Sequence, residues 1–475
     1  MCYPERMKRK ALLINPWIHD FAAYDLWNKP IGLLYLASLL RANDVEVFFL
    51  DALDPFHPAL SGRGSMLRRP KRNDSGHGSY AKAPISKPPP LKTIPRNYSR
   101  YGIPPEVFRN SLTSIPLPDL ILVTSMMTYW YPGVFDAIRI VREIFPPVPI
   151  VLGGNYVTLC PQHASFSGAD YCLPGRAEAT IPSLWRELFH EELPFVPDDR
   201  DLDSHPFPSF DLIRHPQQVP ILTSRGCPYR CSYCASPLLH PRFERRDPIR
   251  VAEEIEYWHG RLGIRHFSFY DDALLFNPPE MANPLLREIL GRQRPIQFHC
   301  PNGLHLRHLS PELALLLFQA NFKTLRFGLE TANASRQTSS GGKVTNKEFA
   351  EAMGWLKRAG YGDREIGIYL LCGLPEQTAD EVRESIRFVR SCGATPILAE
   401  YSPIPGTPLW DDAVSSSSYP IADEPLFHNN TLLPCRSASL TWEIHESLKR
   451  MARDPECGAD LSSSANLLAS VKRSG

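Results

Sequence analysis

Short apolar runs alternate with amphipathic stretches along the first 200 residues. The apolar runs at 10–16, 45–51, 119–125, 149–154 and 170–173 have lengths typical of buried strands. Residues 31–40, 134–145 and 179–190 repeat their apolar positions with helical spacing. This alternation predicts a parallel sheet, because parallel strands need crossover connections. We therefore expect an α/β unit whose five strands form a doubly wound sheet of the Rossmann or flavodoxin-like type.

The pattern stops between about residues 55 and 118. Stretches such as 71–78 and 87–92 are polar and rich in turn-forming residues. A structureless insertion this long inside a compact domain is unusual, and it is commonly functional or disordered. We predict disorder for part of it. Residues 96–104 carry two tyrosines and two arginines, so this end either folds over the edge of the sheet or reaches a ligand.

A second series of strand and helix pairs follows a polar, proline-rich linker. The expected strands are 220–224, 264–271, 296–300, 324–330, 365–372 and 397–401, and the expected helices are 250–262, 279–292, 311–320, 346–359 and 378–391. Six such units predict a partial (β/α)6 barrel of the TIM type, with ligand chemistry at the carboxyl ends of its strands.

These patterns divide the chain into four parts. We place the first domain at 1–197, the linker at 198–217, the barrel at 218–410 and a C-terminal segment at 411–475. Within the last part we expect a linker at 415–418, one amphipathic helix at about 440–453, and fraying of the last twenty residues.

Composition limits the partners and the compartment. The 475 residues suffice for two cores, and 52 basic against 51 acidic residues give a net charge of +1. Near-neutrality carries no electrostatic sign of nucleic acid or an anionic membrane as a partner. We expect neither a signal peptide nor a membrane span, because the N-terminal residues show no apolar h-region with a cleavage site and no apolar run is long enough to cross a bilayer. Eleven cysteines, an odd and scattered set, predict free thiols in a reducing compartment. We expect a cytoplasmic protein.

Three cysteines form the most informative local pattern. Cys227, Cys231 and Cys234 lie on the loop after the first strand of the second series. A structural zinc site closes with four protein ligands, and an electron-transfer iron–sulfur cluster takes four cysteines. Three thiolates therefore predict a coordination position kept open for a substrate. The alternative is a zinc site completed by a further ligand such as His240 or His299.

This spacing, with Tyr233 directly before the third cysteine, resembles the signature of the radical S-adenosylmethionine superfamily. The resemblance implies that Cys227, Cys231 and Cys234 hold a four-iron four-sulfur cluster whose unligated iron is chelated by the amino and carboxylate groups of S-adenosylmethionine. It implies reductive cleavage of S-adenosylmethionine to methionine and a 5′-deoxyadenosyl radical. It also implies an electron donor such as flavodoxin or ferredoxin.

Other segments are similar to the superfamily by position. Asp271 lies where members place a motif, commonly Gly-Gly-Glu, that receives the methionine amino group; that motif is absent, and Tyr270 and Asp272 are further substitutes. The resemblance directs Glu330 at the ribose or the methionine moiety and Gly373 at the adenine. Asp271 as a helix cap or loop carboxylate, and Gly373 as part of a turn capped by Thr378, are the alternatives.

The first domain is similar to the cobalamin-binding domain that precedes the barrel in one subgroup of the superfamily. The similar features are Asn15-Pro16, the helix opening at 30–36, and Gly153-Gly154-Asn155. Together the two resemblances span about residues 8–410. They imply cobalamin bound across the strand ends, against Ser125, Met126, Tyr129, Gly153, Gly154 and Asn155. The Asp-x-His-x-x-Gly motif of cobalt-ligating domains is absent, and we interpret His19 and His57 as surface or loop histidines.

We therefore expect a radical enzyme that methylates an unactivated carbon of a small molecule or peptide. A radical oxidation, cyclisation or rearrangement without cobalamin is the enzymatic alternative. A non-enzymatic metal-binding interaction module is the alternative of another class, and the absence of a basic, aromatic-rich patch in the sequence counts against it.

Overall fold

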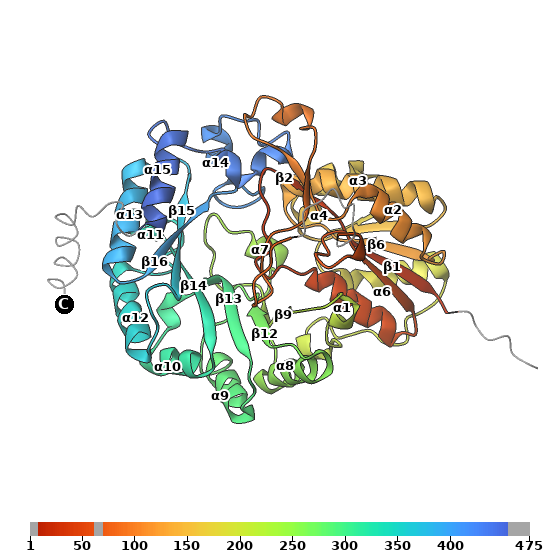
Figure 1. Cartoon of the computed structure of the whole chain (residues 1–475), viewed down its shortest axis with the longest axis horizontal. Helices are drawn as coiled ribbons and strands as arrows, with labels where there is room; N and C mark the ends of the chain where they lie inside the picture. The colour runs from red at the N-terminus through yellow and green to blue at the C-terminus, as the bar shows by residue number, and fades with distance from the viewer. Residues whose placement is uncertain (1–7, 61–69, 455–475) are drawn as a thin grey trace, which may run out of the picture. The chain divides into compact units, whose positions relative to one another are not determined.

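The computed structural model describes residues 8–60 and 70–454. The chain divides into two compact units between Val219 and Pro220, and each is described by itself (Figure 1).

The N-terminal unit contains the expected five-stranded parallel sheet, in the order β3-β1-β6-β7-β8. Its strands are β1 (Lys10–Asn15), β3 (Glu46–Asp51), β6 (Leu120–Val123), β7 (Ile150–Gly153) and β8 (Tyr171–Leu173). The chain passes from β1 outward to β3 and then returns across β1 to β6. In a doubly wound sheet, this reversal opens a crevice at the carboxyl ends of the two central strands.

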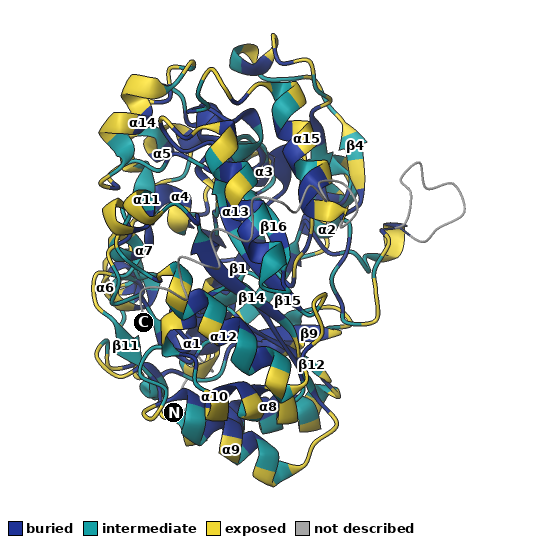
Figure 2. Cartoon of the chain, turned by 90° about the vertical axis from the view of Figure 1, so that its left-hand side faces the viewer, coloured by how far each residue is buried: buried dark blue, intermediate teal, exposed yellow. Residues whose placement is uncertain are grey.

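Both faces of this sheet are covered because successive strand residues point to opposite sides. Leu12 and Ile14 pack in one core with α2 (Pro105–Thr113) and α3 (Tyr131–Ile144). Ala11 and Leu13 pack in the other core with α1 (Ile31–Ala42) and α6 (Ala177–Phe189). The short helices α4 (Asn155–Leu159) and α5 (Pro161–Ala164) follow β7. In Figure 2 the helices show mixed exposed and buried faces, and β1 is mostly buried. Strands β6 and β7 are also buried, whereas β3 and β8 are only partly buried.

The insertion is folded over most of its described length. Strand β5 (Ser99–Tyr101) pairs antiparallel with both β4 (Lys82–Pro84) and β2 (Ile18–Asp20), which lies just after β1. Tyr98 is buried and donates its hydroxyl to the backbone oxygen of His19 at 3.0 Å. The expectation of a structureless segment is therefore wrong for 70–118, because contacts with the distant β2 supply the partners that local periodicity lacks. Residues 61–69 of the predicted disorder lie outside the described residues.

The predicted linker packs against the N-terminal unit rather than standing free. Phe210 is fully buried, and the Ser209 backbone N–H donates to the Leu34 oxygen at 3.1 Å. This segment contains only two 3-10 turns, Leu202–Ser204 and Phe210–Leu212.

The second unit is a six-stranded parallel sheet in the sequential order β9, β12, β13, β14, β15, β16. The strands are β9 (Gln218–Ile221), β12 (His266–Phe269), β13 (Gln297–Leu304), β14 (Phe322–Glu330), β15 (Ile366–Cys372) and β16 (Thr395–Glu400). The helices between them are α8 (Pro248–Leu262), α9 (Ala282–Arg292), α10 (Pro311–Gln319), α12 (Asn346–Ala359) and α13 (Ala379–Ser391). Sequential strands joined by helices form the expected partial barrel (Figure 1).

Local signals define several helix starts. Asp247 and Ser310 cap α8 and α10 with their side chains. Thr345 and Thr378 begin α12 and α13 with complete capping boxes, which satisfy otherwise unpaired N–H groups. Thr378 thus has the capping role that was one alternative for its turn.

The C-terminal segment differs from its prediction in one element. The proposed linker at 415–418 begins inside the helix α14 (Trp410–Ser416). The Ala413 N–H donates to the Leu409 backbone oxygen, and this helical bonding continues to the end of α14. The amphipathic helix α15 (Trp442–Arg453) is present and packs on α13 and β16. The last twenty residues, which we predict to fray, lie outside the described residues. Across the residues the structure describes, none of the helices combines the length and apolarity needed to span a bilayer.

Candidate active site

The three cysteines lie on a loop at the carboxyl end of β9. The loop follows the short strand β10 (Ser224–Arg225), which pairs with β11 (Glu244–Arg245), and precedes α7 (Ser236–Leu239). Cys231 is buried, and Cys227 and Cys234 are half-buried. The trio therefore opens at the end of the sheet where barrel ligands bind.

The segment after β14 supports this loop. The Ser232 N–H donates to the Ser340 backbone oxygen at 3.2 Å. A Cβ built on Gly341, whose φ is +121°, would lie 3.1 Å from Cys231 Cα, so a side chain there would push the loop away. Ser340 and Gly341 follow α11 (Ala334–Ser339). The position of the cysteines thus depends on residues more than one hundred positions away.

Burial raises the pKa of all three thiols, and that of Cys227 reaches about 11. The thiols also interact electrostatically with one another. The Ser236 backbone N–H points at Cys234 Sγ at 3.4 Å and favours the thiolate. A bound metal would deprotonate such thiols outright. The raised pKa values therefore favour neutral thiols without a metal, and a bound metal would convert them to thiolate ligands.

Within 8–60 and 70–454, no three His, Cys, Asp or Glu side chains converge closely enough to hold one ion. A four-iron cluster does not require that convergence, since each cysteine binds its own iron. Of the two histidines considered for zinc, His299 is bonded through one ring nitrogen to Thr324 and through the other to His266. His240 follows α7. The donor set on the loop fits an iron–sulfur cluster.

A buried ion pair lies beside the thiols. Lys343 Nζ is 3.2 Å from Glu330 Oε1, and each side chain is 14% exposed. Burial alone would lower the pKa of Lys343, but Glu330, Cys231 and Cys227 raise it overall. Glu330 ends β14 with a φ of +68°. The candidate Glu330 therefore has a cationic partner, and that partner also faces the cysteines.

Two adjacent aspartates at the end of β12 have different surroundings. Asp271 is 3% exposed, and its Oδ1 accepts hydrogen bonds from Thr223 and from the Ser224 hydroxyl. Asp272 is exposed and accepts a hydrogen bond from Ser236 at 2.6 Å. Asp272 interacts electrostatically with Cys227 and Cys234. The structure thus places Asp272, rather than Asp271, next to the cysteine loop.

Tyr233 and Gly373 complete the predicted residues of this unit. Burial and the nearby Glu330 raise the pKa of Tyr233 well above its usual value. Gly373 follows β15 and donates its N–H to Gln377 Oε1 at 2.8 Å. A Cβ on Gly373 would lie 3.1 Å from the Leu433 side chain. The turn is therefore closed by Gln377 and covered by Leu433.

In the N-terminal unit, a cavity of about 210 Å³ lies at the carboxyl edge of the sheet. We call it the sheet-edge cavity, and Asn15, Ser125, Met126, Gly154 and Asn155 are among its lining residues. A Cβ on Gly154, whose φ is +100°, would lie 2.1 Å from the Ser125 oxygen, so this close approach requires glycine. The lining of this cavity therefore includes four of the six residues predicted here, Ser125, Met126, Gly154 and Asn155.

The other two predicted residues, Gly153 and Tyr129, are not among the residues that line the cavity. The Gly153 backbone oxygen accepts a hydrogen bond from the Ser125 hydroxyl at 2.6 Å. Tyr129 is buried, 6% exposed.

His57 is a half-buried loop residue, as expected. His19 is neither surface nor loop: it lies in β2, 4% exposed, and burial lowers its pKa to about 4.

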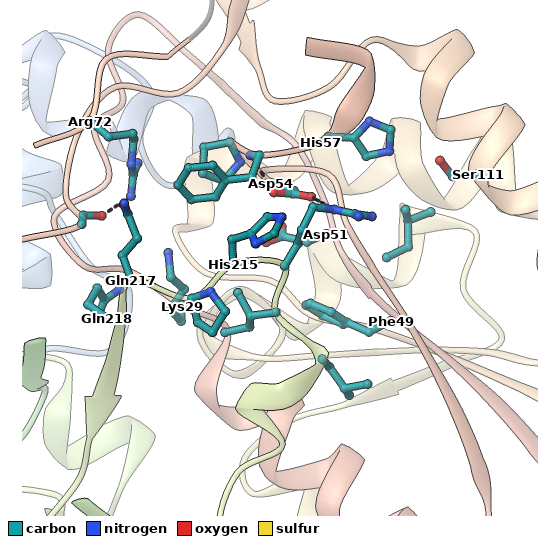
Figure 3. Close-up of a pocket in the computed structure, with 18 of the residues that line it drawn as sticks. Lys29, Phe49, Asp51, Asp54, His57, Arg72, Ser111, His215, Gln217 and Gln218 are labelled. Atoms are coloured by element: carbon teal, nitrogen blue, oxygen red, sulfur yellow. Dashed lines mark hydrogen bonds and ion pairs between the residues drawn. The ribbon is translucent and has the colours of Figure 1, made fainter. Parts of the chain in front are cut away.

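A second cavity of about 240 Å³ adjoins the first, with Lys29, Asp51 and Pro55 lining both. We call it the side cavity (Figure 3). Burial and the neighbouring Asp54 raise the pKa of Asp51 to about 6.

Sequence reasoning missed Lys343, His305 and Arg72. His305 lies 3.8 Å from Cys227 Sγ through its Nε2, and burial followed by Lys343 lowers its pKa to about 2. Lys343 follows Gly341-Gly342, which lie between two helices. This glycine pair is the sequence feature that could have drawn attention to Lys343. Nothing local singles out His305 or Arg72.

Comparison with known proteins gives consistent findings. The family model of the Radical SAM superfamily matches residues 221–389. An uncharacterized methyltransferase of Pyrococcus horikoshii is 25% identical over 331 residues, which are 63% of this chain and 70% of the relative. The hopanoid C-2 methylase of Rhodopseudomonas palustris is 26% identical over 56% of this chain, and the match spans about half, 52%, of that relative.

Among solved structures, the chain is similar to the radical S-adenosylmethionine methyltransferase TsrM from Kitasatospora setae, which was solved with cobalamin and a [4Fe-4S] cluster bound. The TM-score is 0.66 at 17% identity, covering 95% of this chain and 92% of that one. This likeness is one of fold.

Proposed function

The chain belongs to the radical S-adenosylmethionine superfamily, and from that membership we propose that it is a cobalamin-dependent methyltransferase acting on an unactivated carbon. The observation that carries the proposal is the loop of Cys227, Cys231 and Cys234 at the carboxyl end of a partial barrel. The methyltransferase relatives and the preceding doubly wound unit support the methylation step. The substrate class is a small molecule or a peptide.

Cys227, Cys231 and Cys234 would hold a four-iron four-sulfur cluster, which would supply the electron for reductive cleavage of S-adenosylmethionine, and bound cobalamin would supply the transferred methyl group. The chain's own residues would bind and orient these groups. Asp272 offers an exposed carboxylate beside the loop for the ammonium of S-adenosylmethionine. Lys343 offers a cation for its carboxylate and holds Glu330 in place for the ribose.

The N-terminal unit would bind cobalamin at the carboxyl edge of its sheet, where the sheet-edge cavity forms part of the binding surface. Ser125, Gly154 and Asn155 line that cavity, and Gly154 keeps the space beside Ser125 free of a side chain. No lower cobalt ligand is assigned, since His19 is enclosed in β2 and its Nδ1 is 4.0 Å from Asp136. The electron donor would be a small carrier protein such as flavodoxin or ferredoxin, in a cytoplasmic setting that keeps the thiols reduced.

Anaerobic reconstitution tests the cluster. It should yield about four irons per chain, and dithionite with S-adenosylmethionine should then release 5′-deoxyadenosine. Cys231→Ala should abolish this release. Cys435→Ala removes a buried thiol outside the loop and should retain the release. One equivalent of zinc without an iron cluster would overturn the assignment.

Cobalamin binding tests the methylation step separately. The purified chain should shift the visible spectrum of added cobalamin and retain it through gel filtration. A chain that releases 5′-deoxyadenosine but retains no cobalamin would instead carry out a radical oxidation, cyclisation or rearrangement.

A further inference from the structure

The barrel strand β15 has two different faces. Ile366, Ile368 and Leu370 are fully buried on the outer face, where α13 packs on the strand (Figure 1). Tyr369 and Leu371, which alternate with them, are only partly buried. Because successive strand residues point to opposite sides, these two lie on the inner face of the barrel. The inner face is therefore accessible here, as a ligand-binding surface requires.

Arg326 places a cation on the same inner face. It lies on β14 between Leu325 and Phe327, which are fully buried on the outer face, and it is only partly buried itself. Its Cα pairs with that of Gly367 on β15. A Cβ on Gly367 would lie 2.6 Å from Arg326 Nη1 and 2.7 Å from Ile397 Cδ1. The glycine therefore leaves the space in which the guanidinium lies beside the apolar side chain of Ile397.

The charge of Arg326 is uncompensated within the part of the chain that the structure describes. Among those residues its guanidinium forms no ion pair, and its one hydrogen bond runs from Nη1 to the Leu325 backbone oxygen at 3.1 Å. Burial lowers the pKa of Arg326, as expected of a cation that loses water without gaining an anion. Since arginine stays protonated, the folded chain bears this cost. An anion from outside the chain would remove it.

This cation is separate from the residues proposed for S-adenosylmethionine. Lys343, a second cation of the unit, is paired with Glu330. Glu330 comes four residues after Arg326 on β14, which at about 3.3 Å per residue is roughly 13 Å nearer the carboxyl end of the sheet. Arg326 therefore lies deeper in the barrel than the Glu330–Lys343 pair.

The charge and the lining of this surface select the kind of anion. One guanidinium balances the single charge of a carboxylate, and its free Nε and Nη2 edge matches the two carboxylate oxygens. A phosphate monoester carries about −1.5 to −2 at pH 7 and would keep part of that charge unpaired. The neighbouring Leu371 and Ile397 are apolar, and Tyr369 donates its hydroxyl to the Pro301 backbone oxygen at 2.7 Å. The surface thus suits an apolar or aromatic body with one carboxylate.

We propose that Arg326 binds a carboxylate of the substrate, and that the enzyme acts on an apolar or aromatic monocarboxylate. This inference rests on the proposed function, because it names the substrate class of the same enzyme. A carboxylate held deep in the barrel would direct the opposite, apolar end of the molecule toward the carboxyl ends of the strands, where the cysteine loop lies. The unactivated carbon would belong to that apolar end.

A matched pair of probes isolates the charge. Phenylbutyrate has an apolar body and one carboxylate, and phenylbutyramide has the same body without the charge. Their binding to the full reconstituted chain is measured by isothermal titration calorimetry. Wild type should bind phenylbutyrate at least ~10-fold more tightly, because a charge-assisted pair is stronger than a neutral hydrogen bond. Equal affinities, or no binding of either probe at millimolar concentration, would overturn the proposal.

Variants assign the preference to Arg326. Arg326→Gln should abolish the preference for phenylbutyrate and keep the affinity for phenylbutyramide within about 2-fold, which also shows that the variant is folded. Arg364→Gln, which removes an exposed arginine just before β15, should retain the preference. Equilibrium dialysis with S-adenosylmethionine is the check against a cofactor role. An equal loss of S-adenosylmethionine and phenylbutyrate binding in Arg326→Gln would overturn the proposal.

The phosphate of the same body tests the choice of anion. Phenylbutyl phosphate should bind wild type more weakly than phenylbutyrate, because one guanidinium leaves part of its charge unpaired. Tighter binding of the phosphate that is lost in Arg326→Gln would overturn the carboxylate assignment.

Urea unfolding of the unliganded chain separates a binding role from a structural one. Because Arg326 lacks an ion pair, Arg326→Met should leave the equilibrium constant for unfolding unchanged or lower it. A rise of about 10-fold or more would show that Arg326 stabilises the barrel, and would overturn the proposal.

Failure of the proposed function gives a different result. Reconstituted wild type that releases 5′-deoxyadenosine but binds both uncharged and charged probes equally would overturn the substrate assignment alone. Reconstituted wild type that releases no 5′-deoxyadenosine would contradict the radical function, and the substrate assignment with it.

Discussion

At the scale of single residues, the two aspartates after β12 are chemically alike and differ only in their neighbours. Asp271 is enclosed, and its Oδ1 joins the end of β12 to Thr223 and Ser224. Asp272 is exposed beside the cysteine loop. We therefore transfer the proposed ammonium contact from Asp271 to Asp272.

The two aspartates can be tested as a matched pair. Asp272→Asn removes the charge next to the loop and should raise the KM for S-adenosylmethionine about 10-fold in dithionite-driven release of 5′-deoxyadenosine. Asp271→Asn keeps an acceptor oxygen for Thr223 and should change this KM by less than about 3-fold. The reverse pattern would return the ammonium contact to Asp271.

The Glu330–Lys343 pair makes a stability prediction that needs no cofactor. Lys343→Gln leaves a largely buried carboxylate unpaired and should lower the free energy of unfolding by roughly 3 kcal/mol. Adding Glu330→Gln removes the uncompensated charge and should restore most of that loss. Urea unfolding of the two variants measures this. Additive losses in the double variant would contradict the pairing.

At the scale of elements, the last helix is attached to the last barrel strand by charge as well as by packing. Glu400 at the end of β16 accepts from Lys449 of α15 at 3.1 Å, and His445 lies 3.3 Å away. Burial alone would raise the pKa of Glu400, but His445 and Lys449 lower it to about 2. Because the folded pKa is depressed, the contribution to stability is present above pH 4.5 and is lost as the pH falls toward 2.

Glu400→Gln should therefore destabilise the chain at pH 7 by about 2 kcal/mol. The difference from wild type should shrink between pH 4.5 and pH 2, as wild type loses the same interaction. Thermal unfolding followed by circular dichroism at several pH values checks this. Glu446→Gln, which removes an exposed carboxylate of the same helix, should cost under about 0.5 kcal/mol. A pH-independent effect of Glu400→Gln would contradict the charge argument.

At the scale of the whole molecule, two compact units are proposed to hold different cofactors. A ligand at 100 times its Kd stabilises the structure that binds it by about 2.7 kcal/mol. Cobalamin should therefore slow amide hydrogen exchange in peptides of the N-terminal unit. S-adenosylmethionine bound to the reconstituted chain should slow exchange in peptides of the barrel. Peptide-resolved hydrogen exchange measures both effects. Protection of barrel peptides alone by cobalamin would contradict the proposed division.

The strands and helices of both sheets were predictable because their apolar periodicity is local. Alternation along β1, for example, places Leu12 and Ile14 on one face and Ala11 and Leu13 on the other. The insertion was not predictable, since β5 gains its partners from β2, about eighty residues earlier.

The sequence by itself determined the cysteine loop, because three metal ligands within eight residues carry their spacing whatever surrounds them. Only the tertiary structure decided which residues surround that loop and the cavities. Lys343 reaches the thiols through a segment more than one hundred residues from them, and Arg72 reaches Lys29 through Asp25. Electrostatic interactions and hydrogen bonds depend on the distance between groups in space. Residues far apart in the sequence reach that distance only when the chain folds.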